Sequence, residues 1–141
     1  MVIDTEIKFD ADHTVTTEER FALRRWFQEA LGFLNTGAWD EYGKELSDYL
    51  NVNGFTEGVL IKPLYLEFLR SLGFGTAAVV ARYPVIKVSV KLSYFSLVGT
   101  FEAFFDGVLS YEGNIEVLVM KVDDSYQVME IKFYPHMIVS S

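Results

Sequence analysis

The sequence predicts an α+β domain in which three N-terminal helices pack on a curved antiparallel β-sheet. The first half of the chain places apolar residues at helical spacing, and the second half alternates apolar and polar residues as strands do. The length of 141 residues suits one domain, and half of the residues are hydrophobic, which is enough to build a shared core. We therefore expect residues 1–141 to form a single unit.

Residues 1–15 are expected to form an N-terminal arm or a short strand. Apolar or β-branched residues alternate with charged ones from Ile3 onward, which is the pattern of a half-buried strand. Asp10 and Asp12 have the spacing that opens a calcium loop. The loop would need glycine where Val15 stands and a bidentate glutamate where Phe21 stands, so we expect no calcium site.

Two helices are expected after this arm. Thr16 and Glu19 form a capping box that begins the first helix, and Gly37 ends it. The second helix is expected from about Ala38 to the sequence "NVNG" at residues 51–54. Its apolar stripe consists of Trp39, Tyr42, Leu46, Tyr49 and Leu50.

A third helix is expected to begin near Lys62. Pro63 would cost about 3 kcal/mol in a helix interior but almost nothing in the first turn, so the helix starts there. Apolar residues occupy most of its circumference, and we expect it to be covered on several sides.

The rest of the chain has the pattern of strands. The stretch "VIKVSVKLSYF" at residues 85–95 alternates apolar with polar side chains, so one face is buried and the other is wet. Turn or bulge signals divide the remainder. The further strands are Leu97–Phe105, Val108–Val122 and Tyr126–Tyr134, and the signals are Asp106-Gly107, Glu112-Gly113-Asn114 and Asp123-Asp124-Ser125.

The last two strands carry apolar residues on both predicted faces. Because the helices cover only one face, we expect a second copy to cover the other, giving a homodimer through the sheet face. One face is predicted to hold Leu118, Met120, Met129, Ile131 and Phe133, and the other Val117, Val119 and Val128.

Composition and charge exclude several classes of function. The net charge of -8 argues against nucleic-acid binding, and the absence of cysteine excludes disulfides and thiolate chemistry. No apolar segment is long enough for a signal peptide or a membrane span, so a soluble cytoplasmic protein is expected. His13 and His136 lie at opposite ends without companion carboxylates, and no phosphate-binding loop is present. We expect neither a metal nor a cofactor.

Two carboxylates, Glu102 and Asp106, lie among phenylalanines in "GTFEAFFDG". On one strand face they would be about 13 Å apart, outside the separation of about 5 to 9.5 Å that two-carboxylate mechanisms use. Asp106-Gly107 is a hairpin signal, so we expect Asp106 at a turn. Glu102 is expected in solvent or at an interface, because unpaired carboxylates are rarely buried.

Three stretches carry a resemblance to a known fold family. They are "GAWDEY" at 37–42, "GTFEAFFDGVLSYEGNIEV" at 99–117 and "VDDSYQVMEIKFYP" at 122–135. Over roughly residues 16–136, the order of elements resembles the nuclear-transport-factor-2-like fold, and specifically its polyketide-cyclase (SnoaL-like) branch. The closing turn lacks the glycine of that family, and the N-terminal arm is an addition.

This resemblance implies several site positions. In the steroid-isomerase relatives a tyrosine, a carboxylate base after helix 2 and a protonated acid act, and these positions fall near Trp26, Asn53 and Leu118. Asn53 cannot act as a base and Leu118 has no polar atom, which excludes the isomerase mechanism at that placement. In the cyclase branch the resemblance places the base at His136, while Phe101 replaces a second histidine.

The resemblance leaves three functions open, because the family includes enzymes and non-catalytic domains. The helices and the curved sheet of this fold form a cone. The leading hypothesis is a cofactor-free homodimer that binds a small apolar molecule inside this cone. The alternatives are a cofactor-free cyclase, isomerase or dehydratase that uses His136 with Glu102, and a protein-interaction or dimerisation scaffold. The aromatic residues either fill the core or line a cavity. Candidate ligand-binding residues are Trp26, Trp39, Asn53, Tyr65, Phe68 and Arg82.

Overall fold

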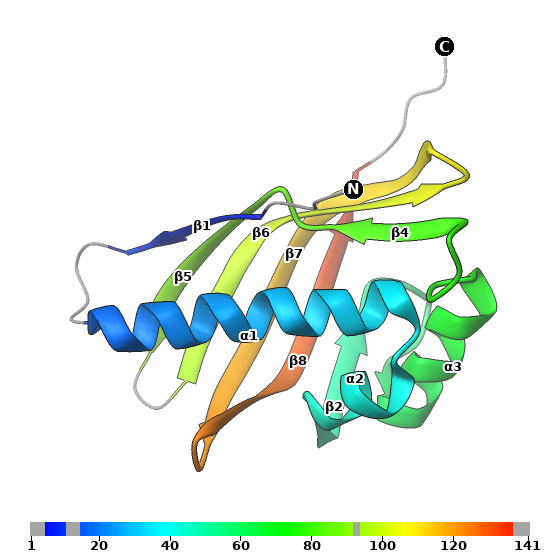
Figure 1. The fold of residues 1–141 in the computed structure, drawn as a ribbon. Coiled ribbons are helices and arrows are strands. Elements are labelled where there is room, and N and C mark those ends of the chain that lie inside the picture. The colour runs from blue at the N-terminus through cyan, green and yellow to red at the C-terminus, as the bar shows by residue number, and fades with distance from the viewer. Residues whose placement is uncertain (1–4, 11–14, 92–93, 137–141) are drawn as a thin grey trace.

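The computed structural model describes residues 5–10, 15–91 and 94–136, and it has the predicted α+β architecture (Figure 1). Its helices lie on one side of a curved, open sheet. They are α1 (Thr17–Thr36), α2 (Trp39–Lys44) and α3 (Lys62–Leu72). The strands are β1 (Glu6–Phe9), β2 (Leu46–Asn53), β3 (Leu60–Ile61), β4 (Val79–Arg82), β5 (Val85–Lys91), β6 (Tyr94–Phe105), β7 (Val108–Val122) and β8 (Ser125–Pro135).

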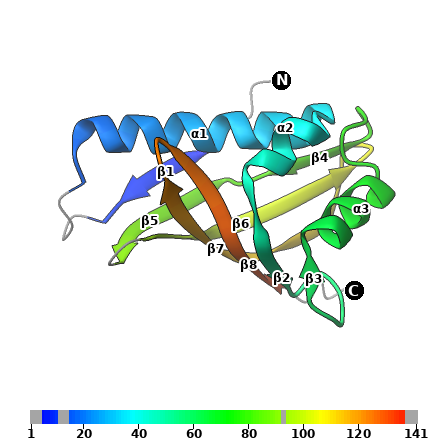
Figure 2. The ribbon, with the colours of Figure 1, turned by 90° about the horizontal axis from the view of Figure 1, so that it is seen from below.

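The sheet has the strand order β1-β5-β6-β7-β8-β2-β3, with β4 pairing to β6. Its centre, from β5 to β8, is antiparallel as predicted. Parallel pairs join it on both sides, β1 with β5 and β2 with β8, so the complete sheet is mixed. The helix α1 spans the domain, and α3 lies at one end beside β2 and β3 (Figure 2).

The predicted N-terminal strand is present as β1, whose Ile7 and Phe9 are half-buried. The guanidinium groups of Arg20 and Arg24 on α1 lie 5.3 and 5.5 Å from the centre of the Phe9 ring. Arg24 also donates to the carbonyl of Ile7 over 3.4 Å. The arm is therefore attached to the start of α1. Asp12, which has calcium-loop spacing from Asp10 but for which no calcium site is expected, lies outside the described residues.

The limits of α1 follow its sequence signals. Thr16 accepts a hydrogen bond of 3.1 Å from the backbone N–H of Glu19, as the capping box predicts. Gly37 ends the helix with a φ of 77°, which glycine adopts without strain. Near this end the amide of Asn35 donates to the carbonyl of Ala81 and accepts from its N–H, over 2.9 and 2.8 Å. This pair fastens α1 to the edge of β4.

The predicted second helix is wrong beyond Lys44, because the chain continues as strand β2. Leu46 and Leu50 are both buried, and their spacing of four residues imitates a helix. Residues four apart also share a face on a strand. The pairing of β2 with β8 is irregular between Leu46 and Asn51, and over this stretch two buried residues are followed by two exposed ones, as on a helix. Tyr49, placed on the predicted helical stripe, is 82% exposed.

The third helix starts at Lys62 with Pro63 in its first turn, as predicted. Its expected burial on several sides is wrong, because only Tyr65 and Leu69 are fully buried and Leu64 is 48% exposed. The strands β3 and β4, on either side of this helix in the sequence, were not predicted. With two and four residues they are too short to show an alternating pattern.

The turns around β7 follow the prediction in part. Asp106 and Gly107 have positive φ angles of 53° and 80°, which confirms the tight turn between β6 and β7. Asp123 has a φ of 56° in the turn before β8. The third signal, Glu112-Gly113-Asn114, is neither: these residues continue β7 and pair with β6 and β8.

The predicted division of the last strands between two faces is partly wrong. The register between β7 and β8 shifts between Leu118 and Val119, which leaves Met129 as an extra residue on β8. Beyond this bulge Ile131 and Phe133 lie on the buried inner face, together with Val117 and Val119. The outer face is therefore less apolar than the sequence suggested.

Candidate functional site

A cavity of about 40 Å³ lies between α1 and the inner face of the sheet, where α2 joins β2. We call it the cone cavity. Its walls come from α1, from the α2–β2 junction, from the segment between β4 and β5, and from strands β6 to β8. The lining residues are Trp26, Phe27, Ala30, Leu31, Leu34, Tyr42, Glu45, Leu46, Tyr83, Leu97, Val117, Val128 and Ile131.

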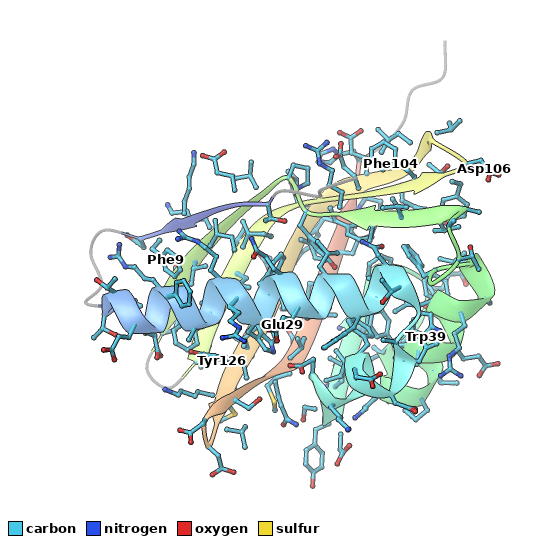
Figure 3. All side chains as sticks on the ribbon, viewed as in Figure 1. Phe9, Glu29, Trp39, Phe104, Asp106 and Tyr126 are labelled. Atoms are coloured by element: carbon cyan, nitrogen blue, oxygen red, sulfur yellow. The ribbon has the colours of Figure 1, made fainter. Side chains whose placement is uncertain are left out.

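Two residues in the lining of the cone cavity are partly exposed to solvent. Among its lining residues only Ala30 and Glu45 are half-buried, and the others are buried. Ala30 lies near the middle of α1, next to Glu29, which Figure 3 labels. We call this part of the lining, between α1 and the α2–β2 junction, the mouth, and we infer that the cavity opens there.

Glu45 is the ionisable carboxylate in this lining, and two contacts fix its place. Its carbonyl accepts a hydrogen bond of 2.8 Å from the N–H of Val128, which joins the start of β2 to β8. Its carboxylate accepts a hydrogen bond from the indole Nε1 of Trp26. Burial raises the pKa of Glu45 above 4.5, the bond from Trp26 lowers it, and the negative charge of Glu29 raises it. The site thus holds a carboxylate against apolar walls.

Buried phenols lie beside this carboxylate. Burial raises the pKa of Tyr42 to about 12 and that of Tyr83 still further, so both hydroxyls are neutral at pH 7. The hydroxyls of Tyr42 and Tyr65 lie 3.4 Å apart within hydrogen-bonding reach. Tyr42 and Tyr83 thus line the cavity as neutral phenols, together with one acid.

The opposite end of the inner face is almost filled. A void of about 10 Å³ remains among aromatic and aliphatic side chains at α3. The Phe55 ring stacks on Phe133 at 4.6 Å and meets Phe101 edge-on at 5.7 Å. Phe68, a predicted ligand-binding residue, belongs to this cluster through its contact with Phe55 at 6.0 Å.

A wider hollow of about 300 Å³ lies at the start of α1, lined by Val15, Thr16, Glu19, Val90 and Phe95. Residues 11–14 and 92–93 adjoin it in the sequence and lie outside the described part of the chain. We assign no site to this hollow.

The structure brings few of the predicted ligand-binding residues together. Trp26 lines the cone cavity, and Tyr65 touches it only through Tyr42. Trp39 is half-buried beneath the guanidinium of Arg70, 5.3 Å from the ring centre. Asn53 is at the end of β2, outside the cavity lining.

The predicted catalytic candidates His136 and Glu102 lie on the outer side of the sheet, away from the cone cavity. The N–H of His136 donates to the carbonyl of Glu112 over 2.9 Å, and Glu112 pairs with Glu102 on β6. His136 and Glu102 are thus two strands apart, about 10 Å. Glu102 is 18% exposed and pairs with Arg82, another predicted ligand-binding residue, at 3.6 Å.

Sequence reasoning missed Glu45 because it placed this residue inside a helix. The resemblance implied a carboxylate directly after helix 2, and the structure ends that helix at Lys44. Glu45, and not Asn53, is thus the residue that follows the second helix. A charged residue between a helix and an apolar strand was the available signal.

Metal and membrane features give no further site. Within residues 5–10, 15–91 and 94–136, no three histidine, aspartate or glutamate side chains lie close enough together to hold a metal ion. In the same part of the chain, no helix combines the length and apolar character needed to cross a bilayer.

Solved structures share this fold at low sequence identity. A proposed scytalone dehydratase from Novosphingobium aromaticivorans has a TM-score of 0.71 at 13% identity, and 85% of each chain is covered. A protein of unknown function with a cystatin-like fold from Nostoc punctiforme has a TM-score of 0.71 at 8% identity, covering 88% of this chain and 96% of that one. The β subunit of benzoate 1,2-dioxygenase from Burkholderia mallei has a TM-score of 0.65 at 7% identity, covering 88% and 93%.

No protein-family model and no curated protein sequence matches the chain. At the identities of the solved structures the likeness concerns the fold alone. The chain has the cystatin-like α+β fold, and the fold predicted from the resemblance to nuclear-transport-factor-2-like proteins is confirmed.

Proposed function

We propose that this chain is a cofactor-free binding domain that holds the small end of a largely apolar molecule in the cone cavity. One observation carries the proposal: the Glu45 carboxylate, bonded by Trp26, lies in an otherwise apolar lining that opens to the surface. Binding pockets commonly combine apolar walls with a few convergent polar groups. Glu45, Tyr42 and Tyr83 are such groups here.

The size of the cavity limits the occupant. A volume of about 40 Å³ has room for about three water molecules, whereas pockets for drug-sized molecules occupy about 300 Å³ or more. The occupant is therefore a small terminal group, and the rest of the molecule passes out between Ala30 and Glu45.

Closing the mouth tests this proposal. Ala30→Leu places a larger side chain at the opening and keeps a good helix former, while Ala22→Leu makes the same change at an exposed position of α1. We expect native mass spectrometry to find a co-purified small molecule on the original chain and on Ala22→Leu, but not on Ala30→Leu. Equal occupancy of all three chains, or no adduct and no fragment binding by ligand-observed NMR, contradicts the proposal.

A second candidate is a cofactor-free isomerase, dehydratase or cyclase in which Glu45 replaces His136 as the acid–base group. The position of Glu45 in an apolar wall favours it, because burial raises the pKa of this carboxyl and so makes it a better base than an exposed carboxylate. The test is hydrogen–deuterium exchange next to the carbonyl of small ketones, followed by NMR. We expect exchange with the original chain and its loss in Glu45→Gln; exchange equal in both chains excludes this role.

We also propose the homodimer through the outer sheet face. Its support is a group of exposed or half-buried apolar side chains on β6 and β7, among them Val98 at 42% and Met120 at 37% exposure, with Leu118. Sedimentation velocity is expected to give a dimer for the original chain and a monomer for Val98→Glu. A monomeric original chain contradicts the dimer and a scaffold function that depends on dimerisation.

A further inference from the structure

Four aromatic residues line the cone cavity. Trp26 and Phe27 come from α1, Tyr42 from α2, and Tyr83 from the segment between β4 and β5. Two of these rings, Phe27 and Tyr83, meet edge-to-face at 5.3 Å and 78°, so their relative orientation is set. Four aromatic rings therefore surround one small space together with the Glu45 carboxylate.

The described lining of this space contains an acidic residue and no basic one. Among the described lining residues Glu45 is ionisable as an acid, and none is a lysine, arginine or histidine. At the mouth, the negative charge of Glu29 acts on Glu45, and Glu29 itself pairs with the exposed Arg25 at 3.1 Å. The strands β6, β7 and β8 contribute only apolar side chains, and the phenols of Tyr42 and Tyr83 are neutral.

An occupant with a positive charge suits this arrangement best. An anion would face the Glu45 carboxylate in a poorly solvated space, with no cation in the walls to offset the repulsion. A neutral hydroxyl or amide group would donate one hydrogen bond to the carboxylate but would leave its charge unpaired. An ammonium group would pair with Glu45, and the aromatic faces would attract it as in known aromatic cages for alkylammonium ions.

We propose that the cone cavity is an aromatic cage for a small alkylammonium head group, with Glu45 as its counter-ion. This inference rests on the proposed binding function and names the class of molecule that the site selects. The limited volume of about 40 Å³ favours a primary ammonium or one with few methyl groups.

The test compares n-butylammonium, 1-butanol and butyrate, which have similar stems and charges of +1, 0 and −1. The readout is the pair of tryptophan indole N–H signals in a ¹⁵N–¹H NMR titration. Trp26 lines the cavity, and Trp39, which does not, is the internal control. We expect butylammonium to shift the Trp26 signal saturably with about tenfold higher affinity than butanol, the effect of about 1.4 kcal/mol, and butyrate to have no effect.

Matched variants assign this preference to Glu45. Glu45→Gln is expected to reduce the preference for butylammonium over butanol to less than about threefold while butanol still binds, and Glu41→Gln, an exposed carboxylate on α2, is expected to keep it. The preference is also expected to fall when acid protonates Glu45. If butanol or butyrate binds as tightly as butylammonium, the cation inference is wrong; if no probe moves the Trp26 signal, the binding function itself fails.

Discussion

The two ends of the sheet's inner face are both lined by aromatic rings, yet they are built differently. At α3 the rings of Phe55, Phe101 and Phe133 contact one another and leave about 10 Å³. At the α2–β2 junction the rings of Trp26 and Tyr42 border about 40 Å³ and share the space with a carboxylate. Aromatic side chains thus stabilise the fold at one end and line a cavity at the other.

At the end of the inner face beside α3, which we call the packed end, a residue without a side chain lets the aromatic rings lie close to the sheet. Gly113 on β7 lies under the Phe133 ring, and a Cβ added there would come within 2.8 Å of that ring and 2.4 Å of the Tyr134 carbonyl. The absence of a side chain at Gly113 therefore allows the rings to approach the sheet. At the cavity end the small residue Ala30 is part of the lining, and about 40 Å³ is left unfilled.

The largest expected effect on the free energy of unfolding comes from removing a ring from the packed end. Phe133→Ala deletes a buried side chain that stacks on Phe55, and we expect it to lower the free energy of unfolding by about 3–5 kcal/mol. Urea denaturation measures the loss. Phe21→Ala, at a position 67% exposed on α1, is the control and is expected to cost less than about 0.5 kcal/mol. Equal losses in the two variants would contradict the assignment of the packed end.

A smaller effect is expected from the cavity end. Trp26→Phe removes the indole N–H that bonds the Glu45 carboxylate, and we expect a loss of about 1.5–3 kcal/mol in urea denaturation at pH 7. Trp39→Phe is the matched control, because the Trp39 ring contacts Arg70 by a cation–π interaction worth about 0.5–1 kcal/mol. A greater loss in the control would mean that the Trp26–Glu45 bond does not stabilise the fold.

The smallest expected effect is a difference in pH dependence. Because the pKa of Glu45 is raised in the folded state, the unfolded chain loses this proton first as the pH rises. The stability contributed by the protonated carboxyl is therefore complete below about pH 4.5 and is lost as the pH rises through the folded-state pKa. Glu45→Gln lacks this loss, so its stability relative to the original chain is expected to be higher at pH 7 than at pH 4 in urea denaturation. A difference that is constant with pH would contradict the raised pKa.

Local signals in the sequence predicted much of the fold. The capping box at Thr16, the proline in the first turn at Pro63 and the Asp106-Gly107 turn each depend on neighbouring residues only, and each is present in the structure. The alternating pattern of β5 likewise indicates which of its side chains face the core.

Irregular pairing explains the errors. In β2 the irregularity after Leu46 makes a strand resemble a helix, and in β8 the extra residue Met129 reverses the faces of Ile131 and Phe133. Such features depend on the partner strand, which a single sequence does not display. The same error affected the prediction of the candidate site. Because the predicted second helix extended past Lys44, Glu45 was placed inside a helix and was not recognised as a site residue.

The amide of Asn35 has a consequence for how the molecule meets other chains. By donating to and accepting from Ala81, one side chain on α1 occupies the hydrogen-bonding groups that the free side of β4 would offer to an added strand. Asn35 therefore blocks the addition of another strand to β4 at Ala81. Replacing it would expose that backbone to pairing with a second chain, and the sheet would gain a place from which it could grow.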